Sequence, residues 1–247
     1  MNTAKEMGRH EIKYYIEPAL VHPILDYARK YVEYDNYAKS QPDHLYTVRS
    51  LYYDSPDLDF YWEKLDGIKV RRKLRIRTYN TRDKNSTAFL EIKRRYNSTI
   101  VKERAQYPFD AVVKMMKNPE QVKIDDSTTS EGSLVLGKWI DNIIRWQLEP
   151  TMMVVYERQP FVGLYDDDNR SRLTIDYNLR VGVISAVNDM FDDSDLIPIT
   201  SNLCILEMKY NHFMPKWMRG LVKEMRLSQQ SISKYCIGVQ ESVFSNS

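Results

Sequence analysis

Charged residues recur at every second position along three runs of the chain between Lys69 and Tyr107. Because residues two apart in a β-strand point to the same side, each run predicts a strand with one mostly basic face. Glu91 is the lone carboxylate on these faces. The predicted faces carry Lys73, Arg75 and Arg77 on the first run, Glu91 and Lys93 on the second, and Lys102 and Arg104 on the third.

The same alternation returns near both ends of the chain, over 9–16, 151–159, 170–177 and 204–210. A single hairpin of this kind is explained by an ordinary antiparallel sheet with one wet face. Repetition of the pattern instead favours strands that close into a barrel with a cationic tunnel inside. The residues expected on the inner faces are Glu11, Lys13, Arg75, Arg77, Glu91, Lys93, Lys102, Arg104, Arg158, Arg172, Asp176, Glu207 and Lys209.

Helical spacing of apolar residues separates these strand-like runs. It predicts helices over 17–34, 55–65, 110–118 and 134–148, and two short helices near the C-terminus, with Ser228 as the N-cap of the second. Helices of this length would cover the outer, apolar face of a sheet. The pattern therefore predicts an α+β fold, with residues 1–247 as one domain.

Composition limits the classes of function. The chain has 247 residues and a net charge of only +2, so an anion site must arise from local arrangement, and a nucleic-acid-binding protein fits poorly. The two cysteines, Cys204 and Cys236, lack the spacing of a zinc site or a disulfide framework. No apolar run approaches the ~20 residues that span a bilayer, and the first residues lack the apolar core of a signal peptide. We therefore expect a cytoplasmic protein with no membrane segment.

The charged faces suggest phosphate chemistry. Guanidinium groups bind phosphate oxygens through paired hydrogen bonds, and Lys supplies a compact charge. Carboxylates suit Mg²⁺ or Mn²⁺, which bridge protein oxygens to substrate phosphates. The alternative is that Glu91, Asp176 and Glu207 only form ion pairs with neighbouring cations. The acidic run 165–169 lacks the rest of a calcium-binding loop and predicts a hairpin turn.

Eight segments occur in the order seen in the VTC domain, the catalytic module of the vacuolar transporter chaperone polyphosphate polymerase. They read HEIKYYI, VRSLYYDSP, KLRIRTY, FLEIKRRYNSTIVKER, VVYERQPF, SRLTIDYNL, ILEMKYN and SISKY. The chain resembles this family from about Arg9 to Gly238, and through it the CYTH-like triphosphate tunnel metalloenzymes.

The resemblance implies an eight-stranded antiparallel β tunnel barrel with covering and C-terminal helices. It implies transfer of the terminal phosphate of ATP to a growing polyphosphate chain, with Mn²⁺ or Mg²⁺. The implied catalytic residues are Lys13, Arg75, Arg77, Lys93, Arg158 and Arg172. The implied phosphate-binding residues are Lys102, Arg104, Tyr156, Lys209 and Lys234. The implied metal ligands are Glu207, Glu91 and Glu11.

Two departures from the family pattern bear on function. Arg9 stands where the wider superfamily has the first Glu of ExExK, which argues against the adenylate-cyclase and thiamine-triphosphatase branch. Ser231 stands where the family often has a second Lys, which bears on how the acceptor chain is held. Two alternatives stay open: a tunnel hydrolase acting on triphosphates or polyphosphate, and a sensor that binds polyphosphate or nucleotide without turnover. The oligomeric state is left undefined.

Overall fold

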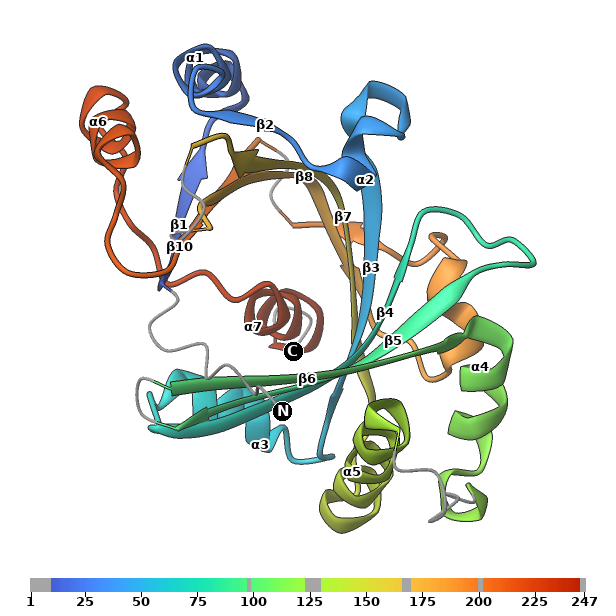
Figure 1. Ribbon diagram of the computed structural model, residues 1–247. Coiled ribbons are helices and arrows are strands. Elements are labelled where there is room, and N and C mark those ends of the chain that lie inside the picture. The colour runs from blue at the N-terminus through green and yellow to red at the C-terminus, as the bar shows by residue number, and fades with distance from the viewer. Residues whose placement is uncertain (1–9, 97–98, 123–129, 166–169, 200–201, 245–247) are drawn as a thin grey trace. The chain divides into compact units, whose positions relative to one another are not determined.

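The computed structural model describes residues 10–96, 99–122, 130–165, 170–199 and 202–244 (Figure 1). Contacts divide the chain into two compact units, and each unit has its own part of the antiparallel sheet and its own apolar core. The prediction of a single domain stays a prediction. The first unit comprises residues 1–47, 156–180 and 198–233, and the second comprises 48–155, 181–197 and 234–247.

The first unit is an antiparallel sheet covered on one face by helices. Its strand order is β1-β10-β8-β7, in which β7 takes part through its C-terminal half. The strands are β1 (His10–Ile16), β10 (Cys204–Tyr210), β8 (Arg172–Gly182) and β7 (Glu149–Gly163), with the short β2 (Val32–Tyr34) on β7 and β9 (Ile197–Pro198) on β8. The helices are α1 (Pro18–Ala28), α2 (Asn36–Lys39), a 3₁₀ turn at Pro42–His44, and α6 (Lys216–Glu224).

Alternate side chains of these strands form the first core. Ile12, Leu173 and Leu206 lie on three different strands and are buried. They belong to one core with Ile24 of α1 and Met218 of α6. Figure 1 shows α1 and α6 beside the β1–β10 edge of this sheet. The residues that alternate with these apolar ones along each strand therefore lie on the opposite, polar face of the sheet.

One element of the first unit differs from the sequence prediction. The helix predicted over 17–34 ends at Ala28, and Val32–Tyr34 forms β2 instead. Val32 lies opposite Gly163 and Tyr34 opposite Phe161 in an antiparallel ladder. The apolar residue at position 32 fits both helix and strand spacing, and pairing with β7 decides between them.

The second unit has the strand order β7-β3-β4-β5-β6, with the N-terminal half of β7 at one edge. Its strands are β3 (Tyr46–Asp54), β4 (Val70–Tyr79), β5 (Thr87–Tyr96) and β6 (Thr99–Pro108). Its helices are α3 (Asp59–Leu65), α4 (Phe109–Lys117), α5 (Glu131–Trp146) and α7 (Lys234–Val239), with 3₁₀ turns at Pro119–Gln121 and Val187–Phe191 and a π-turn at Gln240–Phe244.

The two faces of the second sheet are covered differently. Leu74, Ile76 and Leu90 are fully buried and pack against α4 and α5, where Trp139 is also fully buried. The opposite face of the sheet receives α7, whose Tyr235 packs against Tyr52 with ring centroids 5.2 Å apart. Figure 1 shows α5 and α7 on opposite sides of strands β4 to β6.

A glycine allows α7 to approach its strand closely. A Cβ added at Gly238 would lie 3.0 Å from both Cγ and Sδ of Met152, tighter than ordinary van der Waals contact. The absence of a side chain therefore sets the distance between α7 and β7.

The predicted fold class is confirmed: the structure is an antiparallel α+β fold with covering and C-terminal helices. Eight strands lie along one hydrogen-bonded path, of which β7 belongs to both units, and β1 and β6 are its end strands. Among the described residues no ladder joins β1 to β6, so the closed barrel expected from the sequence is not formed by hydrogen bonds. The second C-terminal helix begins at Lys234, so the prediction of Ser228 as its N-cap was wrong.

We expect Trp139→Ala to lower the free energy of unfolding by about 3–5 kcal/mol, because it leaves a large cavity in the second core. Urea denaturation followed by circular dichroism measures this. Trp62→Ala is the matched control, since the Trp62 side chain is 46% exposed, and its loss should change stability by less than about 1 kcal/mol. Equal losses in the two variants would contradict this account of the core.

Candidate functional site

The second unit presents a basic strand face centred on Glu91. Cross-strand register places Arg75 of β4 opposite Glu91 of β5, and Glu91 opposite Arg104 of β6. Lys93 lies opposite Lys102 one position further along the same face. The residues predicted to share this face do share it, and we call it the Glu91 face: Lys73, Arg75, Arg77, Glu91, Lys93, Lys102 and Arg104.

Glu91 is a buried carboxylate held by three cations. It is 2% exposed, and its oxygens lie 2.6 Å from Arg75 Nε, 3.1 Å from Lys102 Nζ and 3.4 Å from Arg104 Nε. Burial alone acts to raise its pKa, but the charges of Arg75, Arg77 and Lys102 outweigh burial and hold the pKa well below its usual range. Glu91 therefore stays ionised and anchors the surrounding cations.

Tyr52 of β3 lies within this charge cluster. Arg75 Nη1 donates a hydrogen bond to its hydroxyl at 2.9 Å, and Lys73 Nζ lies 5.9 Å from its ring centroid. Burial acts to raise the pKa of Tyr52, but Arg75, Lys73 and Arg77 together overcome it and lower the pKa to about 7. An ordinary tyrosine has a pKa near 10, so the cations stabilise the phenolate.

Other side chains hold this face in place. Arg77 is buried, and its Nε donates to Ser50 Oγ at 3.1 Å. Tyr235 of α7 donates its hydroxyl to the buried Asp54, which also accepts the backbone N–H groups of Phe60 (2.8 Å) and Tyr61 (3.0 Å). Asp54 thus links the start of α3 to α7.

Lys234, the phosphate ligand implied by the family, immediately precedes the anchored Tyr235 and is 9% exposed. Anchoring of Tyr235 therefore restricts the position of the Lys234 backbone as well. Its role as a phosphate ligand stays a prediction.

The first unit presents a second charged face, built around Glu207. The register places Lys13 opposite Glu207 and Glu11 opposite Lys209, so that acids and lysines alternate across β1 and β10. Lys13 Nζ lies 2.8 Å from Glu11 and 3.5 Å from Glu207, whereas Lys209 pairs with Glu207 and lies 3.6 Å from Glu11. We call these four residues the Glu207 quartet.

Arg158 of β7 lies on the same side of the first sheet. Its Nε and Nη2 bind the two oxygens of Asp176 at 2.7 and 2.9 Å, which fixes the plane of the guanidinium. Burial acts to lower the pKa of Arg158, but Asp176 outweighs burial and raises it. The buried Tyr156 lies beneath the guanidinium, 5.2 Å from its carbon to the ring centroid, and Arg172 is exposed opposite Lys209.

The structure distributes the predicted site residues over these two charged faces, one in each unit, except for Lys234, which lies on α7. Their proposed functions stay predictions. Sequence reasoning missed Ser50, Tyr52 and Asp54, although their spacing of two along VRSLYYDSP places them on one face and could have revealed them. It also missed Tyr235, whose contact with Asp54 joins residues 181 positions apart.

The Glu207 quartet has donors that suit a divalent cation. Glu11 and Glu207 contact the same two lysines, so their carboxylates lie near one another, and carboxylate oxygens suit Mg²⁺ or Mn²⁺. Glu91 is surrounded by three cations. Within the described part of the chain, no group of three or more His, Cys, Asp or Glu residues has the geometry of a metal site. Arg9 and residues 166–169, singled out in the sequence, lie outside the described residues.

Both cysteines, Cys204 and Cys236, are buried, and neither forms a disulfide. Among the described residues, no helix is long and apolar enough to cross a bilayer.

An antiparallel sheet that has apolar residues under helices and, in each unit, a charged face defines an α+β protein with charged strand faces. The chain belongs to the VTC domain family, whose model matches residues 8–243. The resemblance inferred from eight short segments is thereby confirmed.

Solved structures that match this chain include a putative adenylate cyclase from Bacillus halodurans, at 10% identity and a TM-score of 0.48, covering 92% of this chain and 96% of its own. A putative adenylyl cyclase from Hippeastrum, described as having a dominant triphosphatase activity, has 14% identity and a TM-score of 0.48, with 96% and 97% covered. The Mimivirus capping enzyme triphosphatase has 10% identity and a TM-score of 0.28, with 87% of each chain covered. No curated protein matches the sequence.

We expect one tyrosine of the folded protein to titrate with a midpoint near pH 7, observed as tyrosinate absorbance in the ultraviolet. Tyr52→Phe should remove this transition. Tyr53→Phe is the matched control, because burial raises the pKa of Tyr53 and its loss should leave the transition unchanged.

The sign of the effect on stability follows from the same pKa. Since folding lowers the pKa of Tyr52 from its ordinary value of 10, its contribution to stability is present above pH 10 and is lost as the pH falls to about 7. A wild-type protein without absorbance change between pH 6 and 8 would contradict this assignment.

Proposed function

We propose that the protein transfers the terminal phosphate of ATP to a growing polyphosphate chain. The observation that carries the proposal is the Glu91 face, where one buried carboxylate holds Arg75, Lys102 and Arg104 close together. Their positive charge exceeds the single negative charge of Glu91, which suits a ligand with several negative charges. Membership of the VTC domain family supports the same class of ligand.

The phosphate-binding residues are proposed from geometry and family together. Arg75, Arg77 and Arg158 are each fixed by a protein partner, Glu91, Ser50 and Asp176 respectively. Donors held in place before the ligand arrives stabilise developing charge without reorganising during the reaction. We assign phosphate binding to these arginines and to Lys13, Lys93, Lys102, Arg104, Arg172, Lys209, Lys234 and the ring of Tyr156.

Glu207 and Glu11 are the proposed ligands of Mn²⁺ or Mg²⁺. When bound, such an ion would neutralise charge on the phosphate oxygens. Lys13 and Lys209 would then shift their contacts from the carboxylates toward phosphate oxygens. Glu91, predicted as a third ligand, is better suited to anchoring cations, because three of them already contact it.

The proposed reaction is an in-line phosphoryl transfer. A terminal oxygen of the acceptor chain attacks the γ-phosphorus of ATP, the bond from that phosphorus to the bridging oxygen breaks, and ADP leaves with the electron pair. The protein acts by positioning and by charge, as in other phosphoryl transfers. Because the reaction uses ATP, a cytoplasmic location is part of the proposal. With water as the acceptor, the same residues would give a hydrolase.

We expect Glu207→Gln to lower the rate of polymer formation by at least about a hundredfold while ATP binding persists, because a neutral amide is a poor ligand for a divalent cation. Purified protein is incubated with ATP and Mn²⁺, polyphosphate is resolved on a gel, and free phosphate and ATP binding are measured in parallel.

Glu157→Gln is the control, since Glu157, like Glu207, is a strand carboxylate paired with a cation, here Arg180, but it lies on the opposite side of β7 from Arg158. It should polymerise at the wild-type rate. Free phosphate without polymer would establish a hydrolase in place of a polymerase, and ATP binding without turnover would establish a sensor. Normal polymerisation by Glu207→Gln would overturn the assignment of that residue.

A further inference from the structure

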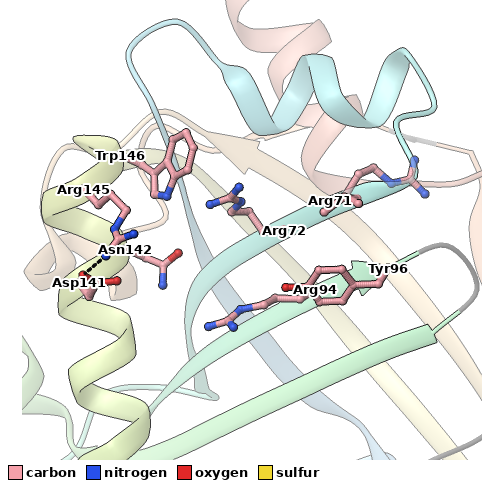
Figure 2. A pocket seen from close by; sticks show the side chains of 9 residues that line it. Arg71, Arg72, Arg94, Tyr96, Asp141, Asn142, Arg145 and Trp146 are labelled. Atoms are coloured by element: carbon pink, nitrogen blue, oxygen red, sulfur yellow. Dashed lines mark hydrogen bonds and ion pairs between the residues drawn. The ribbon is translucent and has the colours of Figure 1, made fainter.

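A pocket of about 210 Å³ lies in the second unit, on the helix-covered side of strands β4 and β5. Figure 2 shows it between these strands and the C-terminal half of α5. Its lining is rich in arginine, although most of β4 and β5 on this face of the sheet is apolar and buried. The lining residues are Val70, Arg71, Arg72, Arg94, Tyr96, Asp141, Asn142, Arg145 and Trp146.

Two arginines break the apolar pattern of this face. On the face covered by α4 and α5, Leu74 of β4 and Ile92 of β5 are fully buried. The neighbouring residues on the same face, two positions along each strand, are Arg72 and Arg94. The register places Arg72 directly opposite Arg94. Like charges directly opposite each other destabilise a sheet, so this pair acts against folding unless negative charge lies nearby.

The guanidinium groups are held at the pocket by separate contacts. Arg72 packs on the ring of Trp146, with 4.1 Å from its guanidinium carbon to the ring centroid. Arg94 Nη2 lies 3.5 Å from Glu103, and Arg145 Nη2 lies 3.0 Å from Asp141. In Figure 2, Arg72 and Arg94 extend from neighbouring strands in the same direction, whereas Arg71 points the other way.

Nearby carboxylates only partly offset these charges. Glu103 also binds Lys138, so its charge is shared between two cations. Asp141 lies beside Arg145 on one turn of α5. Glu63 accepts a hydrogen bond from the backbone of Arg72, and its charge also acts on the Arg72 side chain. Three carboxylates thus face Arg72, Arg94, Arg145 and Lys138, which leaves an excess of one positive charge at this end of the sheet.

We propose that this pocket binds a phosphate-bearing anion with two or more negative charges, at a site separate from the Glu91 face. Arginine forks suit phosphate oxygens, and the pocket is smaller than the ~300 Å³ at which pockets for drug-sized ligands begin, which suits a compact group. The anion is a free oligophosphate or the headgroup of an acidic phospholipid. The exposed side chains of Val70, Tyr96 and Trp146 at the pocket would pack against the hydrocarbon part of a lipid.

The test measures binding of inorganic tripolyphosphate to the full chain by calorimetry, without metal or ATP. We expect Arg72→Gln/Arg94→Gln to lose one equivalent of bound tripolyphosphate per chain. Arg75→Gln/Arg77→Gln, on the Glu91 face, should still bind tripolyphosphate at the pocket and should lose the tripolyphosphate bound at the Glu91 face. The experiment therefore tests the two proposals independently. Unchanged tripolyphosphate binding by Arg75→Gln/Arg77→Gln would count against the proposed function and not against the pocket.

A second variant distinguishes loss of the site from misfolding of the protein. The Arg145 side chain is 66% exposed and pairs with Asp141 within α5, so Arg145→Gln should fold normally. It should still weaken tripolyphosphate binding at the pocket about tenfold, since it removes one charge-assisted contact. Circular dichroism verifies the fold of each variant. Tripolyphosphate binding with unchanged affinity and stoichiometry in both Arg145→Gln and Arg72→Gln/Arg94→Gln would overturn the proposal.

Vesicles separate the two sources of phosphate. Sedimentation with phosphatidylcholine vesicles that contain phosphatidic acid, abolished by Arg72→Gln/Arg94→Gln, would assign a lipid headgroup. Tripolyphosphate binding without such sedimentation would assign a free anion. Trp146→Phe should remove any fluorescence change that accompanies binding, because Trp146 lines the pocket.

Discussion

A buried carboxylate surrounded by cations is the interaction on which the charged half of the second unit depends. Glu91 is nearly inaccessible to water, and an ion in that position requires compensating charge. Arg75, Lys102 and Arg104 supply it from the two neighbouring strands. The same contact therefore neutralises Glu91 and prevents the cations from moving apart, so one acid determines the geometry of a basic surface.

The two units use different devices to hold cations on a strand face. In the second unit, several cations converge on one acid. In the first unit, Glu11 and Glu207 alternate with Lys13 and Lys209 across β1 and β10, so each lysine contacts both acids. The face in the second unit has an excess of positive charge, whereas the acids and lysines in the first unit balance each other. This difference suits phosphate binding at one face and cation binding at the other.

The sequence predicts much of this organisation because strand periodicity is a local property. Alternation alone places Arg75, Glu91 and Arg104 on one face, and the register confirms it. Features that depend on distant contacts could not be predicted in this way. Val32 fits helix and strand equally until β7 pairs with it, and nothing in the sequence near Tyr235 indicates Asp54 as its partner. The arginine pocket also requires α5 to lie beside β4, which spacing along one strand does not define.

The lowered pKa of Tyr52 has a consequence for the energetics of ligand binding. Near neutral pH this residue is divided between phenol and phenolate, because its cationic neighbours stabilise the charged form. A polyanion that binds those same cations would withdraw that stabilisation, and the phenolate would take up a proton from solvent. Anion affinity and proton activity are then thermodynamically linked through a single hydroxyl, so acidification would strengthen binding even where the ligand itself does not change its ionisation.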